Sequence, residues 1–221
     1  MCGRYGLTAN REQLDEAYPV DVVLTEHHPR WNIAPTQEAP VLLSDGSPRR
    51  IVAFRWGLVP HWAKDTSLGP RLINARAETV ASKAAFRDAW RDRRRCLVLA
   101  DGFYEWLKPE DGSAPKIPHW IQMSDGRPFA LAGLWERWGA RDAPLHSFTV
   151  ITTDANELVR PIHDRMPVVL DEKAWALWID PGVPPHEIEG LLVAYPAGGM
   201  RAREVSTYVN DPRHEGEECV R

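Results

Sequence analysis

The stretch Cys96-Leu97-Val98-Leu99-Ala100-Asp101-Gly102-Phe103-Tyr104-Glu105-Trp106 decides the fold class of this chain. It holds two strand-like runs, 96–99 and 103–106, separated by an Asp-Gly pair, and such pairs favour tight reversals between strands. The same turn chemistry recurs at Asp45-Gly46, Asp111-Gly112 and Asp125-Gly126. Working outward, further strand-like runs fill the middle of the chain, at 40–43, 51–56, 120–123, 129–135, 148–152 and 168–170.

Helix-like stretches are fewer, and they do not alternate regularly with the strands. They are predicted at 10–18, 77–92, 155–159, 172–178 and 186–194, and Asn10 and Gln13 have the spacing of a capping box at the start of the first. A parallel doubly wound fold needs that alternation. We therefore predict a single α+β domain over residues 1–221, with a curved or barrel-like, mainly antiparallel sheet and peripheral short helices. Its last ~10 residues are expected to form a tail.

The composition is that of an ordinary globular protein. The 221 residues include 27 Lys plus Arg and 31 Asp plus Glu, a net charge of -4 that excludes a strongly basic, histone-like binder. Three cysteines cannot form a paired framework, and no secretory or membrane-spanning apolar run is present. We expect a cytoplasmic protein without membrane partners, and a monomer as the default.

Common catalytic and metal motifs are missing. The sequence has no GxxxxGK[ST], GxGxxG, GxSxG or HExxH motif. His27-His28 and His214 lack the additional Cys or His at short spacing that a zinc site needs. We therefore expect neither a metal nor a cofactor.

Cys2 is the residue with the clearest chemical potential. Removal of Met1 would leave an α-amine and a thiol on one carbon, and both are partly nucleophilic at neutral pH. Such a 1,2-aminothiol condenses with an aldehyde through its amine, and its sulfur then closes a five-membered thiazolidine ring. Taken alone, a cysteine in a frayed terminus is the commoner explanation.

Three other segments carry groups that suit such chemistry. Glu105 lies inside an aromatic run, where burial would raise its pKa and suit it to proton transfer. His163 and Arg165 flank an acid just before a strand-like run. Asn74 and Arg76 are two residues apart, so in a strand they would share one face. Each considered singly is more simply structural, and spacing does not relate any of them to Cys2.

The ten tryptophans divide between core and surface. Trp56, Trp106, Trp120 and Trp135 lie in strand-like segments and are most simply core, while Trp175 and Trp178 have a helical core-face spacing. Trp31 and Trp62 lie in Pro-rich, loop-like segments and are the better candidates for stacking on bases. The basic run 91–95 reads as a solvated helix end.

Six segments in order resemble the SRAP (SOS response-associated peptidase) family, and the resemblance continues to the Val209-Asn210 region. The segments are Met1-Cys2-Gly3-Arg4, Trp31-Asn32-Ile33-Ala34-Pro35, Trp56-Gly57-Leu58-Val59-Pro60, Asn74-Ala75-Arg76-Ala77-Glu78, Asp101-Gly102-Phe103-Tyr104-Glu105-Trp106 and Ile162-His163-Asp164-Arg165-Met166-Pro167. This resemblance implies a sensor of abasic sites in single-stranded DNA that forms a thiazolidine crosslink to the lesion. It further implies catalytic roles for Cys2, Asn74, Glu105 and His163, and DNA contacts for Arg4, Asn32, Trp62, Arg76 and Arg165.

Two other functions stay open at the level of sequence. One is a thiol autopeptidase that cleaves behind Met1 and uses Cys2 with a nearby base. The other is a non-covalent reader of modified bases or DNA ends, in which Trp62 and the arginines do the binding. A covalent bond to DNA distinguishes the crosslinking function from these two, because a reader releases DNA on denaturation and a peptidase leaves DNA unmodified.

Overall fold

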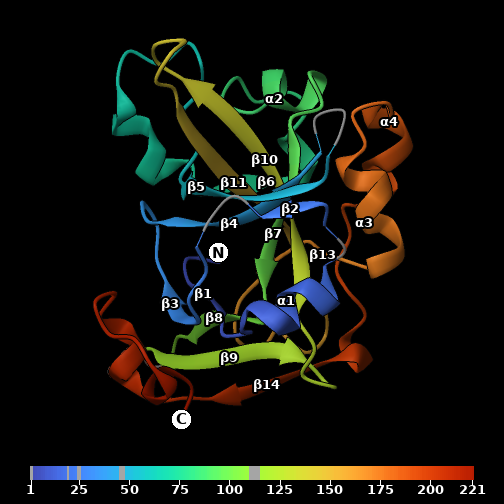
Figure 1. The fold of residues 1–221 in the computed structure, drawn as a ribbon. Coiled ribbons are helices and arrows are strands. Elements are labelled where there is room, and N and C mark those ends of the chain that lie inside the picture. Colours follow the sequence, from blue (N-terminus) through green and yellow to red (C-terminus); the bar gives the residue numbers. More distant parts are fainter. Residues whose placement is uncertain (1, 19, 24–25, 45–47, 110–114) are drawn as a thin grey trace.

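The computed structural model describes every residue except 1, 19, 24–25, 45–47 and 110–114 (Figure 1). The predicted turns at Asp45-Gly46 and Asp111-Gly112 therefore lie outside the described residues. The strands form two sheets, one of nine strands and one of five. Helices are short and lie at the periphery, so the predicted α+β class is confirmed.

The larger sheet closes into a five-stranded barrel. Its hydrogen-bonded ring runs β11–β10–β7–β4–β5 and returns to β11. The first four contacts are antiparallel, and β5 meets β11 in parallel. An odd ring cannot be antiparallel throughout, so one parallel pair is a geometric necessity. The ring strands are β4 (Glu38–Leu43), β5 (Arg50–Trp56), β7 (Arg95–Ala100), β10 (Phe129–Trp138) and β11 (Leu145–Asp154).

The second sheet lies below the barrel in Figure 1 and carries the amino terminus. Its strand order is β14–β9–β8–β1–β3, and all of its pairs are antiparallel. The strands are β1 (Tyr5–Leu7), β3 (Arg30–Ile33), β8 (Gly102–Leu107), β9 (Ile117–Met123) and β14 (Met200–Glu204). Trp31 therefore lies in a strand, and its prediction as a loop residue was wrong.

The Asp101-Gly102 pair joins the two sheets, which corrects its prediction as a turn between neighbouring strands. β7 ends at Ala100 in the barrel, and β8 begins at Gly102 in the second sheet. The Asp101 carboxylate accepts hydrogen bonds from the backbone N–H groups of Thr8 and Ala9, which ties the corner to β1. A Cβ at Gly102 would lie 2.0 Å from the Trp120 ring, so only glycine fits.

The remaining strands are short additions to the barrel. β6 and β12 pair with β11, β13 pairs with β10, and β2 pairs with β5. Their bounds are β2 (Val22–Val23), β6 (Asn74–Arg76), β12 (Arg165–Pro167) and β13 (Val169–Leu170). Asn74 and Arg76 lie in one strand, a strand absent from the sequence predictions, with the buried Ala75 between them.

The helices match the sequence predictions only in part. α1 (Arg11–Ala17) begins with the predicted Asn10/Gln13 capping box, and α3 (Glu172–Ile179) buries Trp175 and Trp178. The stretch 155–159 forms turns, and 186–194 is divided between α4 (Pro185–Ile188) and η3 (Glu189–Leu191). The predicted helix 77–92 is also wrong, because only η2 (Ala77–Thr79) and α2 (Arg87–Arg91) form within it.

The basic run 91–95 is more than a solvated helix end. Arg91 is exposed, whereas Arg95 begins β7 and is 1% exposed. Its guanidinium donates to the carbonyl oxygens of Asp180 and Val183. Arg95 therefore holds the chain that follows α3 against the barrel.

The last residues pack onto the second sheet as a C-terminal clasp, defined here as residues 205–221. It contains η5 (Thr207–Asn210) and η6 (Glu217–Val220). Val205, Val209 and Cys219 are buried against Tyr104 and Trp120. This segment is thus part of the domain, where a tail was predicted. A further turn, η4 (Ala197–Gly199), precedes β14, and η1 (Thr66–Arg71) follows β5.

Candidate functional site

An open groove lies where the amino terminus meets β8 and the clasp. We call it the Cys2 groove, because Cys2 adjoins it through Gly3. Its volume is about 480 Å³, within the range of small-ligand sites. Its walls come from segments far apart in sequence: Gly3, Arg4, Glu105, Trp106, Pro115, Lys116, His163 and Asn210.

Cys2 is buried and is held by Asn74. The Asn74 amide Nδ2 donates to the carbonyl oxygen of Cys2 at 2.7 Å. Burial, and then the nearby Glu105 carboxylate, raise the pKa of the Cys2 thiol well above its usual range. The thiol is therefore neutral in this state, and an adjacent base is needed to activate nucleophiles at this end of the chain.

Glu105 is 2% exposed and belongs to β8. Burial raises its pKa to about 7, as the aromatic run predicted. A carboxyl group with that pKa both accepts and donates a proton at neutral pH, which suits general acid–base catalysis.

His163 faces the same groove from the loop before β12. Burial lowers the pKa of its imidazole, which favours the neutral ring. Nδ1 lies 3.0 Å from the Arg165 backbone nitrogen and 2.9 Å from the Asp164 carboxylate. When Nδ1 accepts from the Arg165 N–H, the proton of the neutral ring lies on Nε2, whereas donation to Asp164 requires a proton on Nδ1.

Arg4 and Asn32 form a bonded pair behind the groove wall. Arg4 Nη1 donates to Asn32 Oδ1 at 2.6 Å and to the Val209 carbonyl at 2.8 Å. Asn32 is fully buried, and its Nδ2 donates to the carbonyls of Val209, Asp211 and His214. Arg4 lines the groove. Asn32 is buried behind it, where it bonds to the clasp and orients the Arg4 side chain.

Arg76 and Arg165 also differ in whether their side chains are exposed or bonded inside the fold. Arg76 is exposed on β6. The Arg165 side chain is 9% exposed and pairs with Glu78 and with Asp154 at 2.8 and 2.7 Å. Direct contact of Arg165 with DNA would require this ion-pair cluster to open, whereas its backbone N–H already orients His163.

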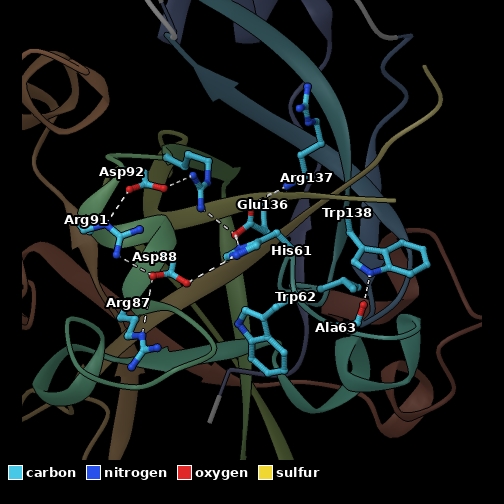
Figure 2. A network of polar contacts seen from close by, with 12 residues as sticks. His61, Trp62, Ala63, Arg87, Asp88, Arg91, Asp92, Glu136, Arg137 and Trp138 are labelled. Atoms are coloured by element: carbon cyan, nitrogen blue, oxygen red, sulfur yellow. Dashed lines mark hydrogen bonds and ion pairs between the residues drawn. The ribbon is translucent and has the colours of Figure 1, made fainter. Parts of the chain in front are cut away.

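Trp62 is 50% exposed on a segment that is fixed at several points (Figure 2). Its indole Nε1 donates to the Ala84 carbonyl at 3.4 Å. Next to it, the Ala63 carbonyl accepts from Trp138, and His61 lies 3.4 Å from Glu136. A large aromatic ring that is exposed on a fixed backbone is well suited to stacking.

Trp106, Asn210 and Lys116 are among the groove residues that sequence reasoning missed. Trp106 was predicted to be core, yet it is partly exposed and lies under the Arg4 guanidinium at 5.9 Å from the ring centroid. Asn210 enters from the clasp, and its only sequence signal was its place at the end of the region of resemblance. Lys116 had no signal, because its position depends on where β9 begins.

Neither a metal cluster nor a membrane helix is found within the part of the chain that the structure describes. No three His, Cys, Asp or Glu side chains there are grouped to hold a metal ion. No described helix is long and apolar enough to cross a membrane.

Comparison with known proteins identifies the family. The sequence profile described as SOS response associated peptidase (SRAP) matches residues 1–212. The chain belongs to the SRAP family. This confirms the resemblance drawn from its six motifs.

Characterised SRAP relatives are named for one activity. The abasic site processing protein YoqW of Bacillus subtilis is 40% identical over 224 residues, which cover 100% of this chain and 99% of YoqW. The abasic site processing protein HMCES of Xenopus tropicalis is 32% identical, covering 88% of this chain and 66% of HMCES. A crystal structure of a Bacteroides thetaiotaomicron protein has the same fold, with a TM-score of 0.86 at 25% identity, and covers 99% of this chain and 98% of that one.

Proposed function

We propose that this SRAP protein recognises abasic sites in single-stranded DNA and forms a covalent thiazolidine crosslink with them through Cys2. The observation that carries the proposal is that the buried Cys2, held by Asn74 and close to Glu105, adjoins the groove that Glu105 and His163 line. The proposal also rests on family membership and on relatives that are named abasic site processing proteins.

The reaction begins once Met1 has been removed and Cys2 carries the free α-amine. An abasic deoxyribose opens to a C1′ aldehyde, and the amine attacks this carbon to give a carbinolamine. Loss of water then forms an imine. Addition of the Cys2 thiol across the C=N bond closes the ring, so the aldehyde and the aminothiol give a thiazolidine and one water molecule.

Glu105 moves the protons in this scheme. Its carboxylate takes a proton from the Cys2 ammonium and passes it to the departing hydroxyl group. A pKa of about 7 suits both halves of that transfer. The high pKa of the Cys2 thiol places the sulfur step second, after the amine has reacted.

His163 and Asn74 assist without forming bonds to the lesion. The neutral His163 ring donates a hydrogen bond from Nε2 to the sugar oxygen, and its protonated form, reached by taking up a proton, is the general acid that opens the sugar ring. Asn74 holds the carbonyl group of Cys2, so the amine and the thiol stay in reach of the same carbon.

The strand would follow the exposed cations and the exposed tryptophan. Arg4 lines the groove, Arg76 is exposed on β6 beyond Asn74, and Trp62 offers a stacking face. Arginines that meet phosphates make binding depend on salt, with a slope of about -0.7 per phosphate for single strands.

The test is a denaturing gel of the purified protein with single-stranded DNA that carries one abasic site. We expect a heat-resistant shifted band for the wild type and at least a ~100-fold loss for Cys2→Ala, because the remaining amine forms only a hydrolysable imine. An intact-base strand and mass spectrometry of the N-terminus are the controls. A protein that lacks Met1 and gives no band, or a Cys2→Ala variant that crosslinks like the wild type, would refute the proposal.

A further inference from the structure

Asn210 is the residue through which the C-terminal clasp enters the Cys2 groove. It ends η5, it is exposed, and it lines the groove together with Glu105 and His163. Its neighbour Val209 is buried, so the side chain of Asn210 is held at the surface by an anchored backbone.

The orientation of the Asn210 amide follows from its partner. Trp106 Nε1 lies 2.8 Å from Asn210 Oδ1. An indole N–H only donates, so the amide must turn its oxygen to Trp106 whichever way the two ends are first assigned. Both hydrogens of Nδ2 are thereby directed away from Trp106 and are available to an acceptor in the groove.

The clasp keeps this donor in place. The Val209 carbonyl accepts from Arg4 at 2.8 Å and from Asn32 at 3.3 Å. Asn32 also donates to the carbonyls of Asp211, which follows Asn210 directly, and of His214, four residues after Asn210. The donor is thus preorganised from both sides, which lowers the entropic cost of using it in binding.

The charges around Asn210 indicate the kind of acceptor. Arg4 and Lys116 line the same groove, and the Arg4 guanidinium lies over the Trp106 ring to which Asn210 is bonded. Glu105, the acidic side chain in this wall, is buried, and burial favours its neutral form. An amide donor beside two cations matches a phosphate oxygen.

We infer that Asn210 is a substrate-contact residue that donates a hydrogen bond from Nδ2 to a non-bridging phosphate oxygen of the strand beside the lesion. This inference rests on the proposed function and adds a contact that comes from the clasp. Trp106 is then a positioning residue, because it acts through Asn210.

The experiment measures binding and crosslinking separately. Affinity is measured with single-stranded DNA that carries a tetrahydrofuran site, which cannot open to an aldehyde. Crosslinking is measured with the natural abasic site at saturating protein. For Asn210→Ala we expect about tenfold weaker binding and a near wild-type rate at saturation, because a hydrogen bond to a charged group is lost. Asn210→Asp should bind more weakly still, because its carboxylate repels phosphate.

Two further comparisons isolate the phosphate contact. Asn210→Ala should leave the salt dependence of binding unchanged, because the amide is neutral, whereas Lys116→Ala should reduce its slope. Replacing the flanking phosphates one at a time by methylphosphonate should remove the Asn210→Ala effect at one linkage only. Trp106→Phe should weaken binding about threefold when Asn210 is present. It should have no effect when it is combined with Asn210→Ala.

Thr207→Ala is the matched control, because it lies on the same 3-10 helix, is exposed and is absent from the groove wall. Unchanged binding in both Asn210 variants, or an effect that persists with every methylphosphonate, would overturn the inference while wild-type crosslinking still supported the function. A wild type that never crosslinks would instead refute the proposed function itself.

Discussion

Two buried glutamates of this protein, Glu105 and Glu136, have almost the same exposure and very different surroundings. Glu105 is 2% exposed and Glu136 is 4% exposed. Glu136 lies on β10, where it pairs with Arg94 at 2.9 Å and accepts the Arg137 backbone N–H at 3.0 Å (Figure 2). Glu105 faces an open groove, and burial raises its pKa to about 7.

The difference separates a carboxylate held in an ion pair from one whose pKa is raised by burial beside a groove. A guanidinium beside a buried carboxylate compensates its charge, and the pair then joins two elements. In the Glu136 network, Asp92 and Asp88 are likewise bonded to arginines. In the Cys2 groove, the Arg4 guanidinium bonds Asn32 and the Val209 carbonyl of the clasp. Residue type and burial alone therefore do not distinguish Glu105, the proposed proton carrier, from Glu136.

The sharpest test of this comparison is the same substitution at both sites. Glu105→Gln removes the proton carrier, and we expect crosslinking to fall by about 100-fold or more. Glu136→Gln should stay within about twofold of wild type, because Glu136 and its partners Arg94 and Arg137 lie outside the Cys2 groove. Single-turnover rates from denaturing gels measure both. Equal losses in the two variants would remove the distinction between them.

The two variants should also differ in stability, with opposite signs. The raised pKa of Glu105 means that its contribution to stability is full below about pH 4.5 and is lost as the pH rises through about 7. Glu105→Gln should therefore stabilise the fold at pH 8 by up to about 3 kcal/mol. Glu136→Gln should destabilise it by about 1–2 kcal/mol through the weakened pair with Arg94. Urea unfolding at pH 5 and pH 8 checks both signs.

The pH profile of crosslinking sharpens the role of Glu105. As the proton acceptor it must be ionised, so the rate should rise about tenfold per pH unit below about pH 7 and then level off. Glu136→Gln should keep this profile, and Glu105→Gln should lose the inflection near pH 7. A wild-type rate that falls between pH 5 and pH 7 would contradict the proposed direction of proton transfer.

The smallest expected effects concern two arginines, one exposed and one ion-paired. Arg76→Ala should weaken DNA binding a few-fold and reduce the salt slope by about 0.7, with little change in stability. Arg165→Ala should mainly lower the free energy of unfolding, by about 1–2 kcal/mol, because it breaks the cluster with Glu78 and Asp154. Fluorescence anisotropy at several salt concentrations, together with thermal unfolding, separates the two. The reverse pattern would place Arg165 on the DNA instead.

Local chemistry explains which parts of the fold were predictable. The capping box of Asn10 and Gln13 acts within four residues, and it was confirmed. The predicted helix 77–92 failed because Val80 and Phe86 are both buried, although six residues place them on different faces of a helix. The prediction of a tight turn at Asp101-Gly102 was wrong because glycine is required there by the ring of Trp120, which lies 18 residues further along the chain.

The sequence indicated some residues of the candidate site, but not how they are arranged. Motifs brought Cys2, Asn74 and Glu105 to notice, and no spacing rule could relate them to one another. The sequence does not show whether a given arginine or asparagine faces solvent or is hydrogen-bonded inside the fold. Only the packing shows that Asn32 holds the clasp while Asn210 lines the groove.

The arrangement of the amino-terminal strand has a consequence for synthesis. β1 pairs with β8, as in Tyr5 with Phe103, and Asn74 holds Cys2. At ~5–20 residues per second, the ribosome needs roughly 5–20 s to make the intervening chain. Under the proposed function, this interval leaves the nascent N-terminus open to an aminopeptidase that removes Met1. The distance along the chain between Cys2 and Glu105 would then act as a delay in which the proposed reactive end is made before it is enclosed.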